Sequence, residues 1–577
     1  MMFTFKRISR CVWVLAAVFG LSGCGGGAGN DQVGLTDPPA NSGSDVTPPT
    51  HNPWTLKSAT EASLSAYLRE ALGPQSANYY ASRGGTETTT AATTTDAVAS
   101  KSADAAVFSA TTVQELGVDE ADLIKSDGVH VFSLDTVDTA SSTTSTRTVL
   151  RRQRLDASAL EAALSPVDSL TIAFSSDVRG SGLYLNADRQ QMVVVADGTG
   201  VPAVYDAWFT PQSWSQGVTE VALVDTSNTS QLQVHRSLRI TAQLIGSRRV
   251  GATLYLVMRS YPQVPGLDPS WPTDKVATNQ ALVNALQPTQ VLPTISVDGA
   301  TAQSLVNPAS CLTQDNNAVK SADIVTLVAI DLAAAHDQRY AARCFTGGTE
   351  AFYMSEKSLY LATTRSPYTY NGTTPVYADQ TSTDIHKFAL DGMVMSYRGS
   401  GNVVGHLGFD QNRKSFRMGE HLGALRVITQ TATAWFGWVV PTTKTTVSTT
   451  TSVTASVESP AHLSILQESD GNLALVGELP NATRPAPLGK EGEQLYASRF
   501  VGSRGYLVTY RLTDPLYVLD LSQPSDPKVA GELQVDGYSD YLFPLTDTLL
   551  LGVGKDAARM AHRAMAVLRG TRGSNCR

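Results

Sequence analysis

The acidic string Asp119-Glu120-Ala121-Asp122 is one place where residue types and spacing suggest chemistry. In helicases these letters accompany a phosphate-binding loop of the form Gly-x-x-x-x-Gly-Lys-Ser/Thr, and this chain has no such loop. We therefore interpret the carboxylates as part of a turn rather than as a nucleotide site. The alternative is a structural calcium ion held by Asp119, Asp122 and Asp127, because hard cations bind clustered oxygens, although the spacing is not that of an EF-hand.

Other catalytic patterns are missing from the sequence. The nine histidines are scattered singly, and no His-Glu-x-x-His places two imidazoles on one face of a helix. No Gly-x-Ser-x-Gly is present to expose a serine nucleophile on a sharp turn. Apart from the calcium alternative, the sequence therefore indicates no cofactor and no catalytic residue.

Cys24 carries the most specific chemical prediction. It follows a basic stretch within residues 6–10 and an apolar segment at residues 11–21, which is shorter than the roughly 20 residues of a membrane-spanning helix. Leu21-Ser22-Gly23-Cys24 looks like the bacterial lipobox, so we predict a signal peptide over residues 1–23 and a lipid on Cys24. Gly25 in place of Asp favours the outer membrane or cell surface if the host has two membranes. The alternative is ordinary cleavage that leaves Cys24 a free thiol.

The remaining cysteines are Cys311, Cys344 and Cys576, because Cys11 leaves with the signal peptide. In an oxidising extracytoplasmic compartment Cys311 and Cys344 are candidates for a disulfide, and the sequence leaves their pairing open. No cysteine spacing suggests zinc.

Charge argues against a nucleic-acid partner. The formal net charge is −8, and removal of the three cations of the signal peptide leaves a mature chain near −11. No basic surface for nucleic acid is implied. After residue 24 no apolar run approaches the length of a membrane span.

A tether, a short helix and a low-complexity segment are predicted between the signal peptide and the folded domain. Residues 24–53 are rich in Gly and Pro and predict a flexible tether. Within residues 54–110 we predict a short helix, with Ser58 as N-cap, Glu61 in a capping box and Gly73-Pro74 as its end, and then a Thr-, Ala- and Ser-rich low-complexity segment.

From about residue 118 the pattern changes to short apolar runs closed by Asp, Gly, Asn and Pro, which is typical of strands joined by tight turns. Ala157–Leu164 is the only other stretch that reads as helical. The strands recur in units whose landmarks are aspartates at positions 225, 331, 391, 470 and 520, spaced by 106, 60, 79 and 50 residues. A unit of about 50 residues with insertions, at residues 259–321 and 441–459, fits a four-stranded propeller blade. We predict an all-β fold, a β-propeller of roughly 6–8 four-stranded blades over residues 111–556.

Two stretches resemble a known family. Thr112–Gly128 and Phe500–Asp556 resemble the opening and closing motifs of bacterial and archaeal secreted proteins with a C-terminal β-propeller domain, distantly related to WD-40 repeats. The resemblance implies a propeller fold and export, and it brings no catalytic residues. The chain departs from the family after Asp556, because residues 557–577 have five Arg, no acid and no strand pattern. We interpret this basic tail as a frameshift or truncation, or else as a native extension.

The leading functional hypothesis is a membrane-anchored extracytoplasmic lipoprotein whose propeller is a non-catalytic binding or scaffold module for a protein, peptide or glycan. The first alternative is an extracytoplasmic propeller enzyme, a hydrolase or lyase, with residues gathered at the central channel. The second is an envelope structural protein. Fold alone does not separate these hypotheses.

Overall fold

The computed structural model describes most of the chain after residue 53. The described ranges are 54–74, 113–138, 146–156, 163–176, 178–198, 217–314, 320, 322–333, 340–365, 368–371, 374–377, 381–408, 410–431, 434–435, 438–439, 459–490, 492–510, 514–535, 538–546 and 549–555. Cys24, the tether and the basic tail lie outside them, so the predictions for these segments stay predictions.

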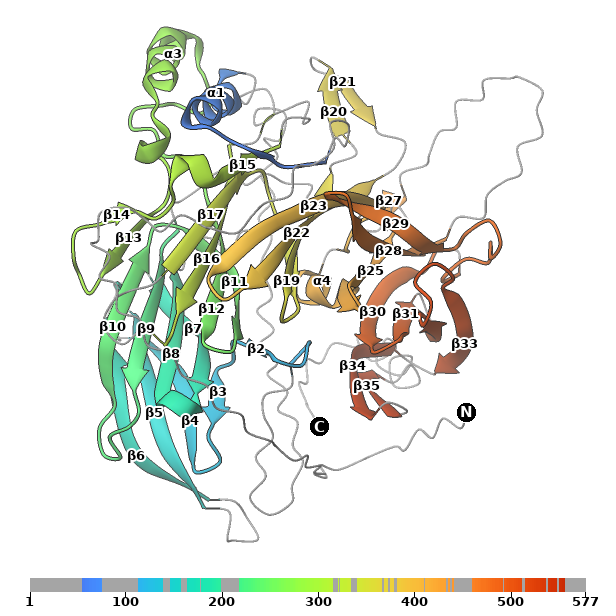
Figure 1. Ribbon diagram of the computed structural model, residues 1–577, viewed down its shortest axis with the longest axis horizontal. Coiled ribbons are helices and arrows are strands. Elements are labelled where there is room, and N and C mark those ends of the chain that lie inside the picture. Colours follow the sequence, from blue (N-terminus) through green and yellow to red (C-terminus); the bar gives the residue numbers. More distant parts are fainter. Residues whose placement is uncertain are drawn as a thin grey trace, which may run out of the picture.

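Six groups of four antiparallel strands, each in chain order, follow one another around an open ring (Figure 1). Blade 1 consists of β3 (Ile124–Ser126), β4 (His130–Asp138), β5 (Thr146–Asp156) and β6 (Ala163–Ile172). Blade 2 consists of β7 (Val178–Asn186), β8 (Gln191–Gly198), β9 (Thr219–Asp225) and β10 (Gln233–Ile240). Blade 3 consists of β11 (Gln243–Val250), β12 (Thr253–Ser260), β16 (Ile324–Asp331) and β17 (Tyr340–Thr346).

The second half of the ring repeats the plan. Blade 4 consists of β18 (Ala351–Met354), β19 (Ser358–Arg365), β22 (Ser382–Asp391) and β23 (Val394–Val404). Blade 5 consists of β24 (Met418–His421), β25 (Ala424–Gln430), β28 (Ala461–Ser469) and β29 (Asn472–Leu479). Blade 6 consists of β30 (Gln494–Val501), β31 (Arg504–Tyr510), β32 (Asp514–Asp520) and β33 (Lys528–Val535). A two-stranded sheet of β34 (Tyr538–Thr546) and β35 (Leu549–Lys555) comes last, and we call it the half-blade.

The aspartate landmarks mark the same place in successive blades. Asp225, Asp331, Asp391 and Asp520 each end the third strand of a blade, and Asp470 directly follows the third strand of blade 5. The repeat read from the sequence is therefore confirmed, and it runs from the third strand of one blade to the second strand of the next. With six full blades and a half-blade, the predicted propeller is confirmed as well.

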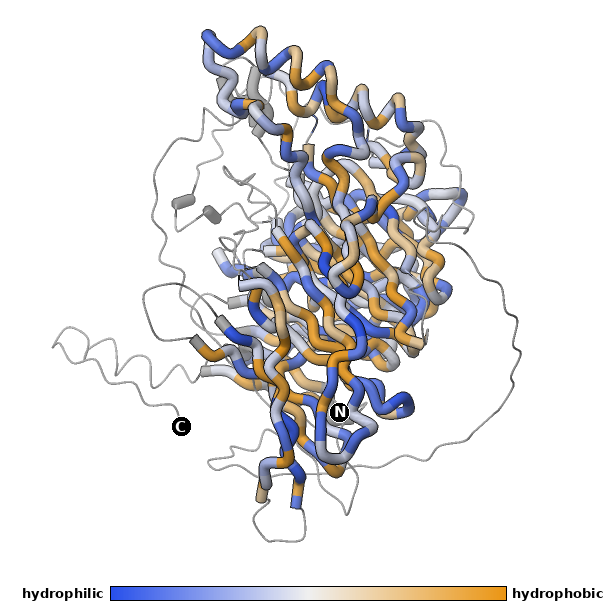
Figure 2. The backbone as a smooth tube through the Cα atoms, turned by 90° about the vertical axis from the view of Figure 1, so that its left-hand side faces the viewer, coloured by the Kyte–Doolittle hydropathy of each residue, from blue (hydrophilic) through white to orange (hydrophobic). Residues whose placement is uncertain are grey.

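The apolar runs form strands because the blades bury both of their faces against neighbouring blades. All eight residues of β12 and all seven of β17 are buried. Burial of one Val or Leu side chain contributes roughly 1.5–3 kcal/mol, so these strands supply much of the cohesion between blades. Figure 2 shows the apolar residues gathered within the body, with hydrophilic residues concentrated in the turns.

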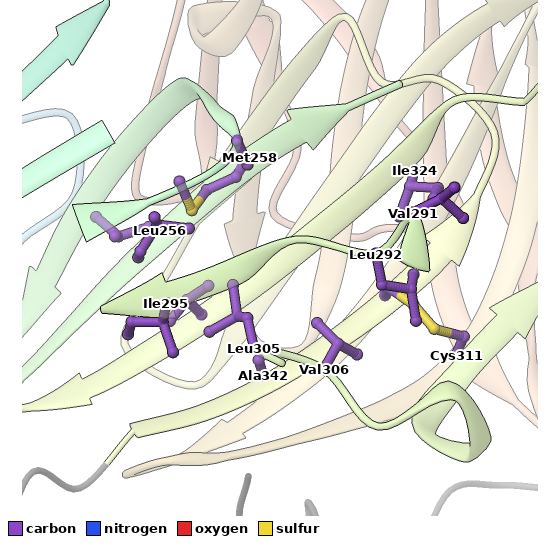
Figure 3. Close-up of a cluster of buried hydrophobic side chains, with 14 of the residues drawn as sticks. Leu256, Met258, Val291, Leu292, Ile295, Leu305, Val306, Cys311, Ile324 and Ala342 are labelled. Atoms are coloured by element: carbon purple, nitrogen blue, oxygen red, sulfur yellow. A yellow bond between two sulfur atoms is a disulfide. The ribbon is translucent and has the colours of Figure 1, made fainter. Parts of the chain in front are cut away.

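The predicted insertion of residues 259–321 lies between β12 and β16. It holds η2 (Thr273–Lys275), α3 (Val276–Ala285), η3 (Pro288–Gln290), β13 (Thr294–Val297), β14 (Gln303–Ser304), η4 (Pro308–Ser310) and β15 (Cys311–Thr313). Val291, Leu292, Leu305 and Val306 of the insertion pack on side chains of β12, β16 and β17 (Figure 3). Strands β13 and β14 extend blade 2, whereas β15 lies parallel to β17 at the outer edge of blade 3.

The N-terminal arm, residues 54–72, is bound to this insertion. Strand β1 (Lys57–Ser58) pairs with β15, and the buried Leu64, Tyr67 and Leu68 of α1 (Glu61–Ala71) join the same core. The helix was predicted, but the predicted cap was wrong by two residues. Thr60 is the N-cap, and its hydroxyl oxygen accepts a 3.1 Å hydrogen bond from the Ser63 N–H. Serine at the third position replaces the expected Glu in the capping box.

The structure differs from the sequence prediction at two other places, one where a helix was predicted and one where a helix was not. Ala163 and Leu164 begin β6, because they extend the antiparallel pairing with β5, and residues 157–162 lie outside the described ranges. Helix α3 was missed, since only Asn279 and Val283 are buried and the apolar stripe is too weak to stand out. Smaller elements are β20 (Tyr368–Asn371), β21 (Thr374–Tyr377), α4 (Gln411–Lys414), η5 (Ser415–Arg417), β26 (Ala434–Trp435) and β27 (Trp438–Val439), together with η1 (Ala187–Arg189) in blade 2.

Among the described residues, none of the helices is both long and apolar enough to cross a bilayer.

Candidate functional site

The chain enters the propeller through residues 113–122, which we call the axial segment. Its strand β2 (Val118–Glu120) pairs antiparallel with β11, the first strand of blade 3, with Asp119 opposite Arg249. Figure 1 shows β2 in the middle of the open ring, between blades 1 to 3 and the half-blade. The motif that resembles the family's opening therefore lies at the centre of the molecule.

Hydrogen bonds connect the axial segment to blades on the far side of the ring. The Gln114 side-chain amide donates to the carbonyl oxygens of Ser415 (2.8 Å) and Met418 (3.2 Å), before and at the start of blade 5. Arg499 of β30 donates to the carbonyl oxygens of Val113 (3.2 Å) and Gln114 (3.1 Å). These contacts place the segment against the first strands of blades 5 and 6.

The remaining blades are reached by the same ten residues. Asp122 forms an isolated antiparallel bridge with Leu183 of blade 2. Gly117, at φ +83°, lies so close to Glu356 of blade 4 that a Cβ atom would clash with its carboxylate. Asp119 accepts a 2.8 Å bond from Lys125 of blade 1. The axial segment thus contacts all six full blades, including blade 3 through β2.

The acidic string is neutralised by the protein itself. The Asp119 carboxylate lies 2.8 Å from Lys125 Nζ and 3.0 Å from Arg249 Nη2, and Glu120 Oε1 lies 3.3 Å from Arg248 Nη2. The Asp122 carboxylate accepts a 2.7 Å hydrogen bond from the N–H of the next residue, Leu123. Asp127 accepts the N–H groups of Val129 and His130 in the β3–β4 turn. The predicted turn is therefore wrong for Asp119 and Glu120, which form ion pairs from strand β2, while Asp122 and Asp127 accept backbone N–H groups.

A second polar cluster lies beside the axial segment and joins Glu115, Tyr353 and Glu420. Burial raises the pKa of Glu115, against the lowering effects of a hydrogen bond with Tyr353 and of the nearby Arg499 and Arg426. The Glu420 carboxylate accepts hydrogen bonds from Tyr360 (2.9 Å), Ser358 (3.2 Å) and Ser355, and the Glu420 N–H donates to Tyr353 (2.8 Å). Burial, more than the adjacent carboxylates, raises the pKa of both tyrosines.

Sequence reasoning missed this cluster. Its members come from the axial segment, β18 and β24, and no short motif links positions 115, 353 and 420. The sequence could have pointed to the cluster in one way, because a charged or phenolic residue stands within an otherwise apolar first or second strand of a blade. Chemically, the cluster is a hydrogen-bonded network in which Lys387 lies 3.8 Å from Glu420 and the charges of Arg426 and Arg499 act on Glu115.

Two large apolar side chains that are close in sequence to members of this cluster are exposed. Leu116 follows Glu115 and is 93% exposed, and Leu422, two residues after Glu420, is 82% exposed. Leu422 has φ +51° in the tight turn between β24 and β25. At the equivalent position of two other Gly-containing turns the chain has Asp298 and Asp470, which suit left-handed backbone better than leucine does.

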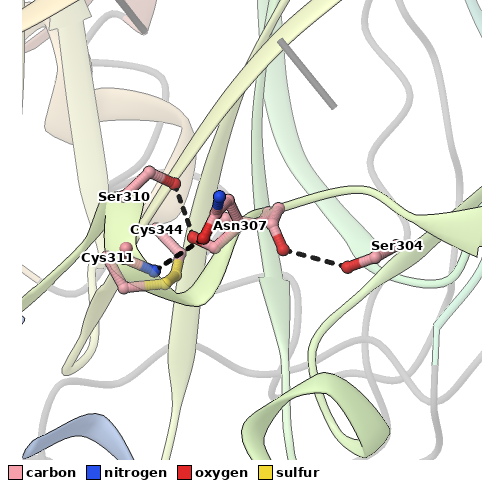
Figure 4. Close-up of a disulfide and its surroundings, with 7 residues drawn as sticks. Ser304, Asn307, Ser310, Cys311 and Cys344 are labelled. Carbon is pink, nitrogen blue, oxygen red and sulfur yellow. Dashed lines mark hydrogen bonds between the residues drawn. A yellow bond between two sulfur atoms is a disulfide. The ribbon is translucent and has the colours of Figure 1, made fainter. Parts of the chain in front are cut away.

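Cys311 and Cys344 are joined in a disulfide (Figure 4). They are direct partners in the parallel pairing of β15 and β17, and their Cα atoms are 4.4 Å apart. Asn307 positions the chain before Cys311, since its side chain accepts the Ala309 N–H at 2.9 Å. The bond ties the insertion to the outer strand of its own blade.

No group of three or more His, Cys, Asp or Glu side chains suited to a metal ion occurs within the described ranges. Of the calcium candidates, Asp119 is paired with cations, and Asp122 and Asp127 bind backbone N–H groups. This donor set does not fit a calcium ion.

Asp197, at the end of β8, gives the propeller a testable pH dependence. Burial raises the pKa of its carboxyl to about 6, although the Leu244 N–H donates to it at 3.2 Å across the boundary of blades 2 and 3. The pKa of Asp197 is higher in the folded chain than in the unfolded chain. The stability that its protonated carboxyl contributes is therefore fully present below about pH 4 and is lost as the pH rises through about 6. The free energy of unfolding of the natural chain should therefore fall between pH 4 and pH 7.5. In Asp197→Asn this fall is expected to be smaller by about 2–3 kcal/mol.

Urea denaturation at the two pH values measures this effect, and the exposed Asp188→Asn is the control. An unchanged pH dependence in Asp197→Asn would contradict the assignment.

Comparisons with known proteins place these features in context. A family model described as "Beta propeller domain" matches residues 108–572 and so includes part of the basic tail. An uncharacterized protein of Methanocaldococcus jannaschii is 37% identical over 174 residues, which are 30% of this chain and 22% of the relative. An uncharacterized protein of Archaeoglobus fulgidus is 50% identical over 64 residues, which are 11% of this chain and 10% of the relative.

The chain thus matches less than a quarter of the length of either relative. Among solved structures, the β-propeller domain of the Trilobed protease from Pyrococcus furiosus is similar with a TM-score of 0.27 and 7% identity, over 73% of this chain and 88% of that chain.

Proposed function

We propose that this chain, which belongs to the Beta propeller domain family, is an extracytoplasmic lipoprotein whose propeller is a non-catalytic binding module for a protein partner. One observation carries the proposal: the axial segment contacts every full blade and neutralises the charged groups around it. Enzymatic propellers would need free acids, bases or nucleophiles near this axis. Among the described residues of the axial segment, Asp119 and Glu120 form ion pairs that join blades.

We therefore expect the surface beside the axial segment to bind the protein partner. A leucine in left-handed backbone costs about 1 kcal/mol relative to a favourable conformation, and exposure of its side chain gains nothing for the fold. Leu422 combines both disadvantages, and Leu116, which follows Glu115 in the chain, is exposed as well. Exposed apolar side chains framed by polar groups are typical of protein contact sites. This favours a protein or peptide over a glycan.

A crosslinking pulldown from membranes of the native host tests this function. We expect a stoichiometric protein partner with the natural chain and with Leu475→Asn, a control at an exposed leucine of β29. Leu422→Asn should lose the partner while the melting temperature stays equal or rises, because Asn suits the turn better than Leu. Recovery of the same partner with Leu422→Asn, or of none with the natural chain, would refute the proposal.

The proposed anchor on Cys24 has a separate test. Burial of acyl chains contributes about 0.8 kcal/mol per CH2, so a modification with two or more chains holds the mature protein firmly. Cys24→Ser removes the thiol and is expected to move the protein from the membrane fraction to the soluble fraction. Cys11→Ser, in the signal peptide, should leave it in the membrane fraction. Membrane retention of Cys24→Ser would contradict lipidation.

A further inference from the structure

The half-blade differs from every other blade in the number of its strands. Its first strand, β34, packs against β30 and β31 of blade 6, as the first strand of a further blade would. Its second strand, β35, has β34 on one side and no strand partner on the other among the described residues. The third and fourth strands that complete each of the six full blades are missing from the described half-blade.

Within the part of the chain that the structure describes, the outer edge of β35 also lacks the protection that other outer strands have. Strand β15 covers β17 and strand β13 covers β10, while β6 carries Pro166 and Asp168 and β33 carries Lys528 and Glu532. Strand β35 reads Leu-Leu-Leu-Gly-Val-Gly-Lys, without proline or acid and with its only charge at the end. Leu551 and Val553, two positions apart and so on one face of the sheet, are 43% and 42% exposed. Such an edge is a template for pairing with another strand.

We propose that β35 pairs with β35 of a second copy of this chain, so that two half-blades form one four-stranded antiparallel sheet in the order β34-β35-β35-β34. The strand count argues for this occupant, since two strands from each copy equal the four strands of every full blade. The sequence is also self-complementary. Pairing centred on Gly552, the middle of β35, uses all seven residues and sets Leu551 of each copy opposite Val553 of the other.

The pairing meets no like-charge repulsion, because the end residue Lys555 would lie opposite Leu549 of the second copy. A single strand pair is a small interface, so the association depends on concentration. Confinement on one membrane would raise the effective concentration of the two copies.

Light scattering of the purified full chain between about 1 and 100 µM, at the scale where weak interfaces associate, tests the proposal. The natural chain should shift from the mass of one copy toward that of two. Val553→Lys should raise the dissociation constant at least tenfold, as a charge in the middle of the pairing does. Val529→Lys, at an equally exposed valine (42%) on the charged strand β33, should associate like the natural chain.

Hydrogen exchange of residues 549–555 gives a readout independent of any variant, because their amides should become protected as the natural chain is concentrated. A natural chain that stays monomeric over the whole range would overturn the proposal. So would dimers of Val553→Lys as tight as those of the natural chain. Protection of β35 at every concentration in a monomer would show that another segment or another protein occupies the edge, and this too would overturn it.

Discussion

Replacement of Asp119 by alanine is expected to lower the free energy of unfolding by about 3–5 kcal/mol, the range for loss of one partner from a buried ion pair. Asp119 is the shared acceptor for Lys125 and Arg249, which come from blades 1 and 3. The Lys125 side chain is 4% exposed, so water cannot replace the lost carboxylate. Lys125 Nζ keeps its bond to the Glu120 carbonyl oxygen at 2.8 Å and its position over the Tyr184 ring, but neither supplies the full negative charge that Asp119 provides.

Urea denaturation with an unchanged m-value measures the loss. Asp135→Ala is the matched control, because it removes the partner of Arg151 in an ion pair whose side chains are both nearly half exposed, and it should cost less than 1 kcal/mol. In the Asp119→Ala background, Lys125→Met should recover part of the stability, since it removes the buried cation that the Asp119 carboxylate neutralised. Equal effects of Asp119→Ala and Asp135→Ala would contradict a cohesive role of the axial segment.

The parts of the fold that the sequence predicted are those set by local chemistry. The third strand of a blade ends at aspartate because its side chain accepts nearby backbone N–H groups, as Asp225 does from Ser227 and Asp520 from Ser522, both two residues ahead. Asp331 accepts the Ala333 N–H in the same way, and this recurrence along one chain is enough to find the blade. The insertion was recognisable for the same reason, because it interrupts the spacing of the landmarks.

The centre of the molecule could not be predicted in this way. Gln114 finds its acceptor at Met418, and Glu115 finds Tyr353, over separations of hundreds of residues. No periodicity encodes which side chains meet at the axis, because the geometry of the ring brings first strands of different blades together. The turn predicted for the acidic string was wrong for Asp119 and Glu120, because both lie in β2 and pair with β11. Nothing in the sequence indicated that Asp119 joins blades 1 and 3.

Removal of the Cys311–Cys344 disulfide is the other change with a large expected effect. The bond closes a loop of 33 residues that contains β16, and restriction of such a loop in the unfolded chain is worth about 3–4 kcal/mol on the chain-entropy account. Both cysteines are buried beside Val291, Leu292 and Ile324, where the insertion meets blade 3 (Figure 3). The double variant Cys311→Ala with Cys344→Ala is therefore expected to lose about 4 kcal/mol, including a small cavity term.

Denaturation with and without a reductant separates the bond from the packing of its side chains. The natural chain and Cys576→Ser should both lose about 3–4 kcal/mol on reduction, whereas the double alanine variant should not respond to reductant. Because β1 pairs with β15, which carries Cys311, loosening of the bond should also free the N-terminal arm. Faster proteolysis between residues 54 and 72 in the reduced protein is thus expected. If the reduced chain were as stable and as resistant as the oxidised chain, the bridge would not be what fixes the insertion and the arm to blade 3.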